Sequence, residues 1–223
     1  MLILIAIAAA VIIIACTLAE AFGNDEIFTE GQRSTAPCVD TEFVPTPKDV
    51  EYIKETKRVI VEALGEDYIE GIMELKALEE RIDKIKPLCE ALGELYELED
   101  VTFELCYDEY NYKSCGKYSP KEKKILINTY FLAFDNSEII TDFIDTVLHE
   151  CRHAVQMKML LNYDKKDYRW YSGDKAVEGF AKNIRQGIIT PKENIKAYRE
   201  QATERDAYAM AALILAGDKE GGI

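Results

Sequence analysis

The chain begins with an apolar run and continues with a polar stretch that shows no sustained period. Residues 2–18 contain no charged side chain, and the first one is Glu20. Such a run is short for a membrane-spanning helix and long for the apolar core of a signal peptide. We therefore expect residues 1–22 to be a signal peptide or membrane anchor, 23–46 a linker and 47–223 the folded domain.

Two processing sites fit the apolar run, and both place the protein outside the cytoplasm. Ala19-Glu20-Ala21 is a small-x-small cleavage site, typical of a secreted protein. Ile13-Ile14-Ala15-Cys16 resembles the lipobox of a lipoprotein that is anchored through Cys16. In either case the membrane is contacted only through this N-terminal segment. The alternative is that the run forms a buried helix of the core.

From residue 46 onward the apolar positions recur every three or four residues, which is typical of amphipathic helices. Thr46 is expected to cap the first of these helices, Pro47 to begin it and Gly65 to end it. A second helix is predicted over about 67–85, and Pro87 is expected to begin a third, short one.

After residue 100 the apolar positions alternate with polar ones, which predicts strands. The strands are expected over 101–106, 112–118 and 124–128, and they form a small antiparallel sheet. A long helix is expected to begin near Asn136, so the fold class is α+β. The later helices are predicted over 175–185 and 191–215.

Charge narrows the range of partners. The 223 residues carry a formal net charge of −14, and no basic cluster interrupts it. Such a field repels nucleic acid and anionic lipid surfaces, so neither is expected to bind the folded domain. With 48% hydrophobic and 30% charged residues, the chain has the composition of an ordinary folded globule.

The two histidines of the chain lie four residues apart in the sequence His149-Glu150-Cys151-Arg152-His153. Residues at this spacing share one face of a helix, so both imidazoles can reach one cation. Neutral imidazole suits zinc, and Glu150 can reach a water on that zinc as a general base. The apolar residues of this helix are expected on the opposite, buried side. The alternative is an amphipathic helix with two surface histidines.

A catalytic zinc ion takes three protein ligands and keeps one position open, so a third ligand must come from elsewhere. No other histidine is present, and a carboxylate is the natural candidate. On the last predicted helix Glu204 lies on the same side as Ala207 and Ala211, whose small size allows close approach to another helix. Glu200 lies one turn earlier on that side and remains an alternative ligand.

This layout resembles the gluzincin zinc metallopeptidases, most closely the small ImmA-like group. The segment 149–156, His-Glu-Cys-Arg-His-Ala-Val-Gln, is similar to their active-site helix. The segment 204–207, Glu-Arg-Asp-Ala, is similar to their Glu-x-(Glu/Asp)-Ala element, in which the first acid is the third zinc ligand. The resemblance covers about 101–212 and implies a zincin-like fold that holds one zinc ion, with Glu204 as the third ligand.

One position departs from the family pattern. Many gluzincins place Asp or Asn four residues after the ligand glutamate, where it can orient a zinc-bound histidine. Here that position is Tyr208. If Glu200 were the ligand instead, Glu204 would take the orienting place.

The resemblance implies hydrolysis of peptide bonds. Glu150 is expected to take a proton from the attacking water and to pass it to the leaving amine. Tyr198 and Tyr208 are candidate donors to the oxyanion. We therefore expect an exported or membrane-tethered zinc peptidase with a peptide or protein substrate. The alternatives are a non-catalytic zinc-binding module for interaction or sensing, and a cytoplasmic ImmA-like regulatory protease.

The cysteines allow disulfides if the protein is exported. Cys106 and Cys115 flank a predicted turn, so a bridge between them is the first choice. A bridge between Cys38 and Cys89 would tie the linker to the domain and leave Cys151 as a buried thiol. In a cytoplasmic protein all of these thiols would stay reduced.

Overall fold

The computed structural model describes residues 43–111 and 115–216, which form an α+β domain as the sequence predicts. The elements in chain order are α2 Pro47–Leu64, α3 Tyr68–Glu74, α4 Leu78–Leu95, β1 Thr102–Cys106, β2 Gly116–Ser119, β3 Lys124–Asn128, η1 Thr129–Ala133, α5 Ser137–Leu161, α6 Asp174–Gln186, α7 Pro191–Arg199 and α8 Ala202–Leu215. The predicted signal peptide or anchor and most of the predicted linker lie outside the described residues. Within the described ranges, no helix is long and apolar enough to cross a membrane.

Helix α2 begins and ends where the sequence signals place it. The Thr46 hydroxyl accepts a hydrogen bond from the Asp49 amide at 3.2 Å, and the Asp49 carboxylate accepts one from the Thr46 amide at 2.9 Å. This reciprocal capping box satisfies two backbone donors that the first helical turn leaves unpaired. Gly65 ends the helix with a φ of 98°, a conformation that favours glycine.

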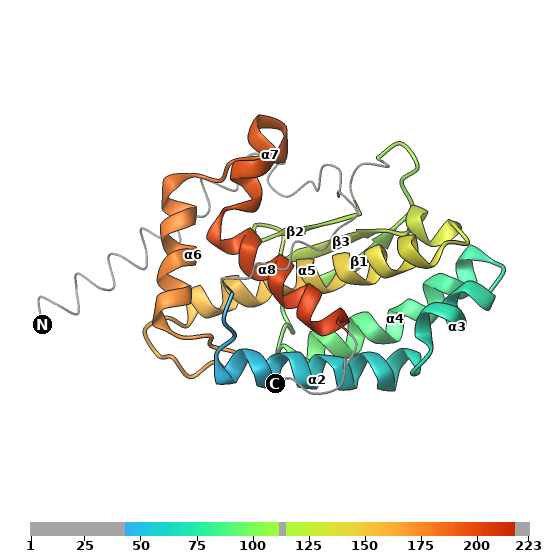
Figure 1. Ribbon diagram of the computed structural model, residues 1–223, viewed down its shortest axis with the longest axis horizontal. Helices are drawn as coiled ribbons and strands as arrows, with labels where there is room; N and C mark the ends of the chain where they lie inside the picture. Colours follow the sequence, from blue (N-terminus) through green and yellow to red (C-terminus); the bar gives the residue numbers. More distant parts are fainter. Residues whose placement is uncertain (1–42, 112–114, 217–223) are drawn as a thin grey trace, which may run out of the picture.

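Helix α5 runs through the middle of the domain, with β2 and β3 above it and α2 below it in Figure 1. Helices α6 and α8 also pack against it. Every residue from Thr146 to Gln156 is buried. The sequence predicts burial of one side only, and this prediction is wrong because α8 covers the histidine side. Ala207 and Ala211 of α8 are 0% and 1% exposed, and their small side chains allow the close approach.

The sheet has the strand order β1-β3-β2 and is mixed, so the predicted fully antiparallel sheet is wrong. Strand β2 pairs with β3 in antiparallel fashion, whereas β1 pairs with β3 in parallel, with Phe103 opposite Ile125. Alternation of apolar and polar residues is the same in both arrangements, so it reports a strand but not its direction. The central strand β3 buries Ile125 and Ile127 completely.

Strand β2 lies close to α5 at Gly116. A Cβ atom on this residue would lie 2.8 Å from Thr146 Cγ2, 3.0 Å from Ile127 Cδ1 and 3.1 Å from the Leu126 carbonyl oxygen. The first distance is shorter than Cβ contacts in proteins, and the other two are tighter than usual, so neighbouring atoms would have to shift. Glycine at this position lets the strand lie close to the helix.

We expect Gly116→Ala to lower the free energy of unfolding by about 1–3 kcal/mol, because it overpacks the contact between β2 and α5. Chemical denaturation measures this directly. Gly71→Ala on α3 is the matched control, since no atom lies within 4 Å of the added Cβ and alanine favours the helix. Equal midpoints for Gly116→Ala and the unmodified protein would show that the strand does not press on α5.

The single helix predicted over 67–85 is wrong, because the chain breaks between α3 and α4. The helix predicted to begin at Pro87 is also wrong, because α4 continues through this residue. The side chain of Arg81, 3% exposed, stabilises this arrangement. Its guanidinium donates to the carbonyl oxygen of Leu75 at 2.9 Å and to that of Leu132 at 2.8 Å. Because Leu132 is remote in sequence, helical periodicity could not reveal the break.

The last predicted helix, 191–215, is also two helices, α7 and α8. The break occurs at Gln201, whose backbone is extended with φ −63° and ψ 140°. The side-chain amide of Gln201 accepts a hydrogen bond from the Ile189 N–H through its oxygen and donates one to the Ile189 carbonyl oxygen through its nitrogen, both at 2.9 Å. Asn183 of α6 also donates to this amide at 3.0 Å. In Figure 1, α7 consequently lies at the top of the domain, apart from the line of α8.

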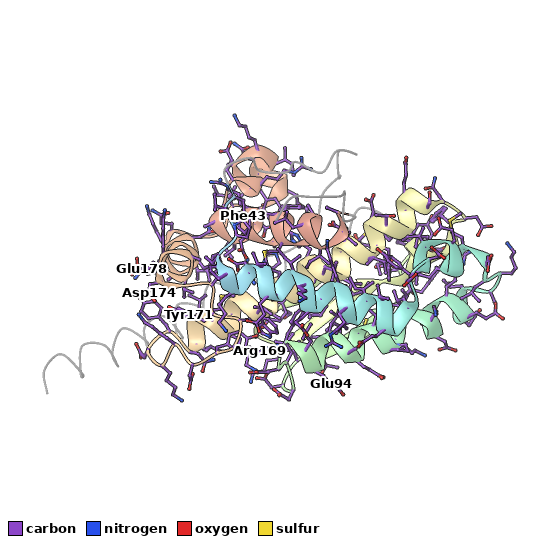
Figure 2. All side chains as sticks on the ribbon, turned by 60° about the horizontal axis from the view of Figure 1, so that its bottom comes forward. Phe43, Glu94, Arg169, Tyr171, Asp174 and Glu178 are labelled. Carbon is purple, nitrogen blue, oxygen red and sulfur yellow. The ribbon has the colours of Figure 1, made fainter. Side chains whose placement is uncertain are left out.

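Aromatic side chains fix the loop between α5 and α6 against α2. The rings of Tyr52 and Tyr96 stack with centroids 4.7 Å apart, and Trp170 of the loop meets Tyr52 edge-on at 5.5 Å. Arg169, labelled in Figure 2, lies beside α2 and reaches the Glu51 carboxylate at 3.3 Å. The loop is therefore held against the first half of α2.

Candidate metal centre

Three side chains from two helices meet between α5 and α8. His149 Nε2 and His153 Nε2 are 3.0 Å apart. The Glu204 carboxylate lies 3.4 Å from His149 Nε2 and 3.3 Å from His153 Nε2. The three side chains are 1%, 3% and 0% exposed, in that order. The structure thus brings together the two histidines and the carboxylate that the sequence singles out.

The arrangement fits a tetrahedral cation. Zinc ligands at about 2.0–2.1 Å from the ion are separated from one another by about 3.3 Å. The three observed separations, from 3.0 to 3.4 Å, lie close to that value. Both oxygens of Glu204 are buried, and the imidazole nitrogens at 3.4 and 3.3 Å are too far away for short hydrogen bonds to the carboxylate. A cation between the three side chains would lie closer to these oxygens than the imidazole nitrogens do.

Burial and neighbouring charges have opposite effects on the pKa values of His153 and Glu204. Burial lowers the pKa of His153, but the Glu204 carboxylate more than offsets this and raises the pKa to about 9. Burial likewise raises the pKa of Glu204, but His153 and His149 hold it well below its usual range. The pair is therefore charged in the absence of a metal ion, and a cation that bound here would displace the proton of His153.

Glu200, the alternative third ligand, is not brought to this cluster. It is the C-cap of α7, and its side chain is 63% exposed, 3.8 Å from Lys196 Nζ. The break at Gln201 separates it from the face of α8 that carries Glu204. The expectation that both glutamates share one helical face is therefore wrong.

Glu150 and the two predicted tyrosines also lie at the cluster. Glu150 is 2% exposed, and its charge raises the pKa of His153 and of Tyr198. Burial, followed by the charge of Glu204, raises the pKa of Tyr198 well above its usual value, so its hydroxyl keeps its proton. The ring of Tyr208 lies 4.5 Å from the ring of His149. At the position where the family resemblance suggests an orienting carboxylate or amide, this chain has a ring that packs on a histidine.

A buried polar network behind His153 was not predicted from the sequence. Gln156 contacts His153 Nδ1 at 2.9 Å through its amide oxygen and donates to Asp206 at 2.7 Å through its amide nitrogen. Arg152 donates to both oxygens of Asp206, at 2.7 and 3.0 Å. Two signals could have indicated it. Gln156 follows His153 by three residues on the helix, and Arg152 is a charge on a buried stretch that requires partners.

The predicted disulfide is not formed. Cys106 and Cys115 are not bonded to each other, and the Cys106 thiol donates to the carbonyl oxygen of Ile127 at 3.7 Å. Cys38, the other predicted partner of Cys89, lies outside the described residues. Burial raises the pKa of Cys89 to about 12 and that of Cys151 well above its usual value, so both thiols stay protonated.

A small pocket reaches His153 from the side of the sheet. Its walls are mainly apolar, and six of the residues that form them are Tyr118, Pro120, Met157, Leu160, Ile184 and Ile188. These come from the end of β2, the last turns of α5 and the end of α6. The pocket has space for about one water molecule, so mainly apolar walls reach the side of His153 without leaving a large cavity.

Comparisons of the chain with protein-family models, curated proteins and solved structures find no match. The candidate metal centre is therefore supported by the residues themselves and by their arrangement.

Proposed function

We propose that the protein is a zinc-dependent peptidase of the gluzincin class, with one ion on His149, His153 and Glu204. The observation that supports this most strongly is the triad of buried donor atoms 3.0–3.4 Å apart, with Glu150 next to it in the chain. A zinc ion at this site supplies a Lewis acid and lowers the pKa of a water molecule. The helix α5 beside a small sheet, with the third ligand on a later helix, supports a zincin-like fold.

The residues around the triad have separate roles in this proposal. Glu150 takes the proton of the attacking water and delivers it to the leaving amine. Tyr198, whose hydroxyl stays protonated, can donate a hydrogen bond to the oxyanion. Tyr208 supports the ring of His149. The low exposure of the whole cluster excludes bulk water and strengthens these electrostatic interactions.

The substrate in this proposal is a peptide or protein. The proposed location is outside the cytoplasm, secreted or tethered to a membrane. This part of the proposal is supported only by the apolar run over 2–18.

A second candidate function is a zinc-binding module without turnover. It is favoured by one observation, namely that the three candidate ligands and Glu150 are 3% exposed or less. A catalytic site needs an open coordination position, so the side chains that bury this cluster would have to move before a substrate carbonyl could reach it. A structural or sensing site needs no such opening, but it also has no use for the carboxylate of Glu150.

Metal binding is the first expected result. We expect one zinc ion per chain in metal analysis, and a stabilisation of about 2.7 kcal/mol at a free zinc concentration about 100 times the Kd. Thermal unfolding with and without a chelator measures this. Glu204→Ala should lose the zinc-dependent stabilisation, because it removes one of three ligands.

The matched control is Glu200→Ala, which makes the same change at the carboxylate that the structure leaves exposed. This variant should bind zinc as the unmodified protein does. Equal zinc affinity for Glu204→Ala and Glu200→Ala would remove Glu204 from the ligand set. A peptide-library digest then separates the two functions. Cleavage that a chelator stops and zinc restores indicates the peptidase, whereas zinc binding without cleavage indicates the non-catalytic module.

A further inference from the structure

The amide group of Gln156 is held in one orientation by the groups around it. Its side chain is 2% exposed and makes three contacts. The amide nitrogen lies 2.8 Å from the carbonyl oxygen of Thr203 and 2.7 Å from Asp206 Oδ2. The amide oxygen lies 2.9 Å from His153 Nδ1. All hydrogen-bonding capacity of the NH₂ group is therefore used on α8.

The identity of the two amide ends follows from the chemistry of these partners. A backbone carbonyl oxygen can only accept hydrogen bonds. A carboxylate that already receives hydrogen bonds from an arginine also acts only as an acceptor. The end of Gln156 that faces Thr203 and Asp206 must therefore be its NH₂ group. A flipped amide would place its oxygen against two other oxygens. The amide oxygen must consequently face His153, where it accepts a hydrogen bond from Nδ1–H.

In the neutral form of His153, which a metal ligand must adopt, this orientation determines which ring nitrogen carries the hydrogen. A neutral imidazole with hydrogen on Nδ1 has its lone pair on Nε2. Nε2 is the atom that lies 3.3 Å from Glu204 and 3.0 Å from His149 Nε2. We propose that Gln156 is a positioning residue of the metal centre, whose amide, oriented by Asp206 and the Thr203 carbonyl, selects the His153 tautomer that presents Nε2 to a cation. The proposal rests on the metal site proposed above but not on peptidase activity.

The two histidines differ in this respect. His149 Nδ1 has no hydrogen-bond partner among the described residues, and its ring packs on Tyr208 instead. Its ring can therefore be held in place by contact while its tautomer is left open. Of the two histidines, only His153 is therefore oriented through Nδ1 by a hydrogen bond with a described side chain, that of Gln156 on the same helix.

Arg152 holds Asp206 in the orientation that Gln156 requires. Its guanidinium donates to both carboxylate oxygens of Asp206, and it also reaches Asp49 at 3.3 Å and Ser172 at 2.9 Å. Ser172 donates in turn to Asp49 at 2.6 Å. Asp206 is therefore fixed by a charged side chain on the opposite helix, so its free lone pair points at the Gln156 amide.

The test uses the full-length protein and the variant Gln156→Met. Methionine keeps the approximate volume of the side chain but cannot form the hydrogen bonds of the glutamine amide. We expect zinc affinity, measured by competition with a chromophoric chelator, to fall about 10- to 100-fold. Gln201→Met is the matched control, because Gln201 is also a buried glutamine with hydrogen bonds to backbone and side chains, but to neither histidine. It should lose stability without losing zinc affinity.

A second readout follows the tautomer itself and does not depend on folding stability. With only two histidines in the chain, ¹⁵N-histidine spectra of the zinc-loaded protein can be assigned fully. We expect a slowly exchanging Nδ1–H on His153, and loss of its protection from exchange in Gln156→Met. Wild-type zinc affinity in Gln156→Met, or a His153 that carries its hydrogen on Nε2, would overturn the proposal.

The outcomes also separate this proposal from the proposed function. If the protein binds zinc through a protonated His153 Nδ1 but cleaves no peptide, the positioning role stands and the peptidase proposal fails. If Gln156→Met binds zinc normally while the protein is an active peptidase, only the positioning role fails. If the protein binds no zinc, both proposals fall together.

Discussion

Replacing Arg152 with methionine should remove about 3–5 kcal/mol from the free energy of unfolding, the largest effect on stability expected for a single substitution at this site. Arg152 is 1% exposed and lies between the carboxylates of Asp206 and Asp49. Burial opposes the charge of its guanidinium, but Asp206 raises the pKa of Arg152 above its usual value, so it stays charged. Its removal leaves two buried carboxylates without their counter-ion.

Urea denaturation of the metal-free protein measures this cost without interference from zinc binding. Arg58→Met on α2 is the matched control, because Arg58 also pairs with two carboxylates, Glu55 at 3.0 Å and Glu62 at 2.6 Å. That arginine is half exposed, and exposed ion pairs contribute about 0–1 kcal/mol. If the two variants lose the same free energy, the buried network does not stabilise the packing of α5, α8 and α2.

Glu150→Gln should keep the zinc ion and lower peptidase turnover by about 10²- to 10⁴-fold. The amide has nearly the same shape as the carboxylate and can fill the same buried position, but it cannot take a proton from the attacking water. Glu150 is not one of the three side chains that surround the candidate ion, so the metal content should not change. Peptide hydrolysis and zinc content are measured on the same sample.

Glu138→Gln is the control for this substitution, since Glu138 lies in the first turn of the same helix and is exposed. Its activity should equal that of the unmodified protein. A fully active, zinc-loaded Glu150→Gln would refute the general-base role. A protein that binds zinc but shows no activity before any substitution would instead support the non-catalytic module.

The candidate ligands could be predicted because the signals for them are local or compositional. His149 and His153 are one helical turn apart, so their common face depends only on helix geometry. With two histidines in the chain, a carboxylate was the natural candidate for the third ligand, and the small residues near Glu204 pointed to the helix that could approach. Glu200 carried the same signal, and only the break at Gln201 excludes it.

Signals within a few residues were thus sufficient for the α+β class, for the start and end of α2, and for the paired histidines. Four features could be seen only in the folded chain: the strand direction, the two helix breaks, the burial of the candidate metal centre and the contacts of His153. Each of these depends on groups far apart in sequence, such as Arg81 with Leu132, 51 positions away, and Gln156 with Asp206, 50 positions away. Periodicity reports which face of an element is apolar, but the partner that meets that face is selected by packing.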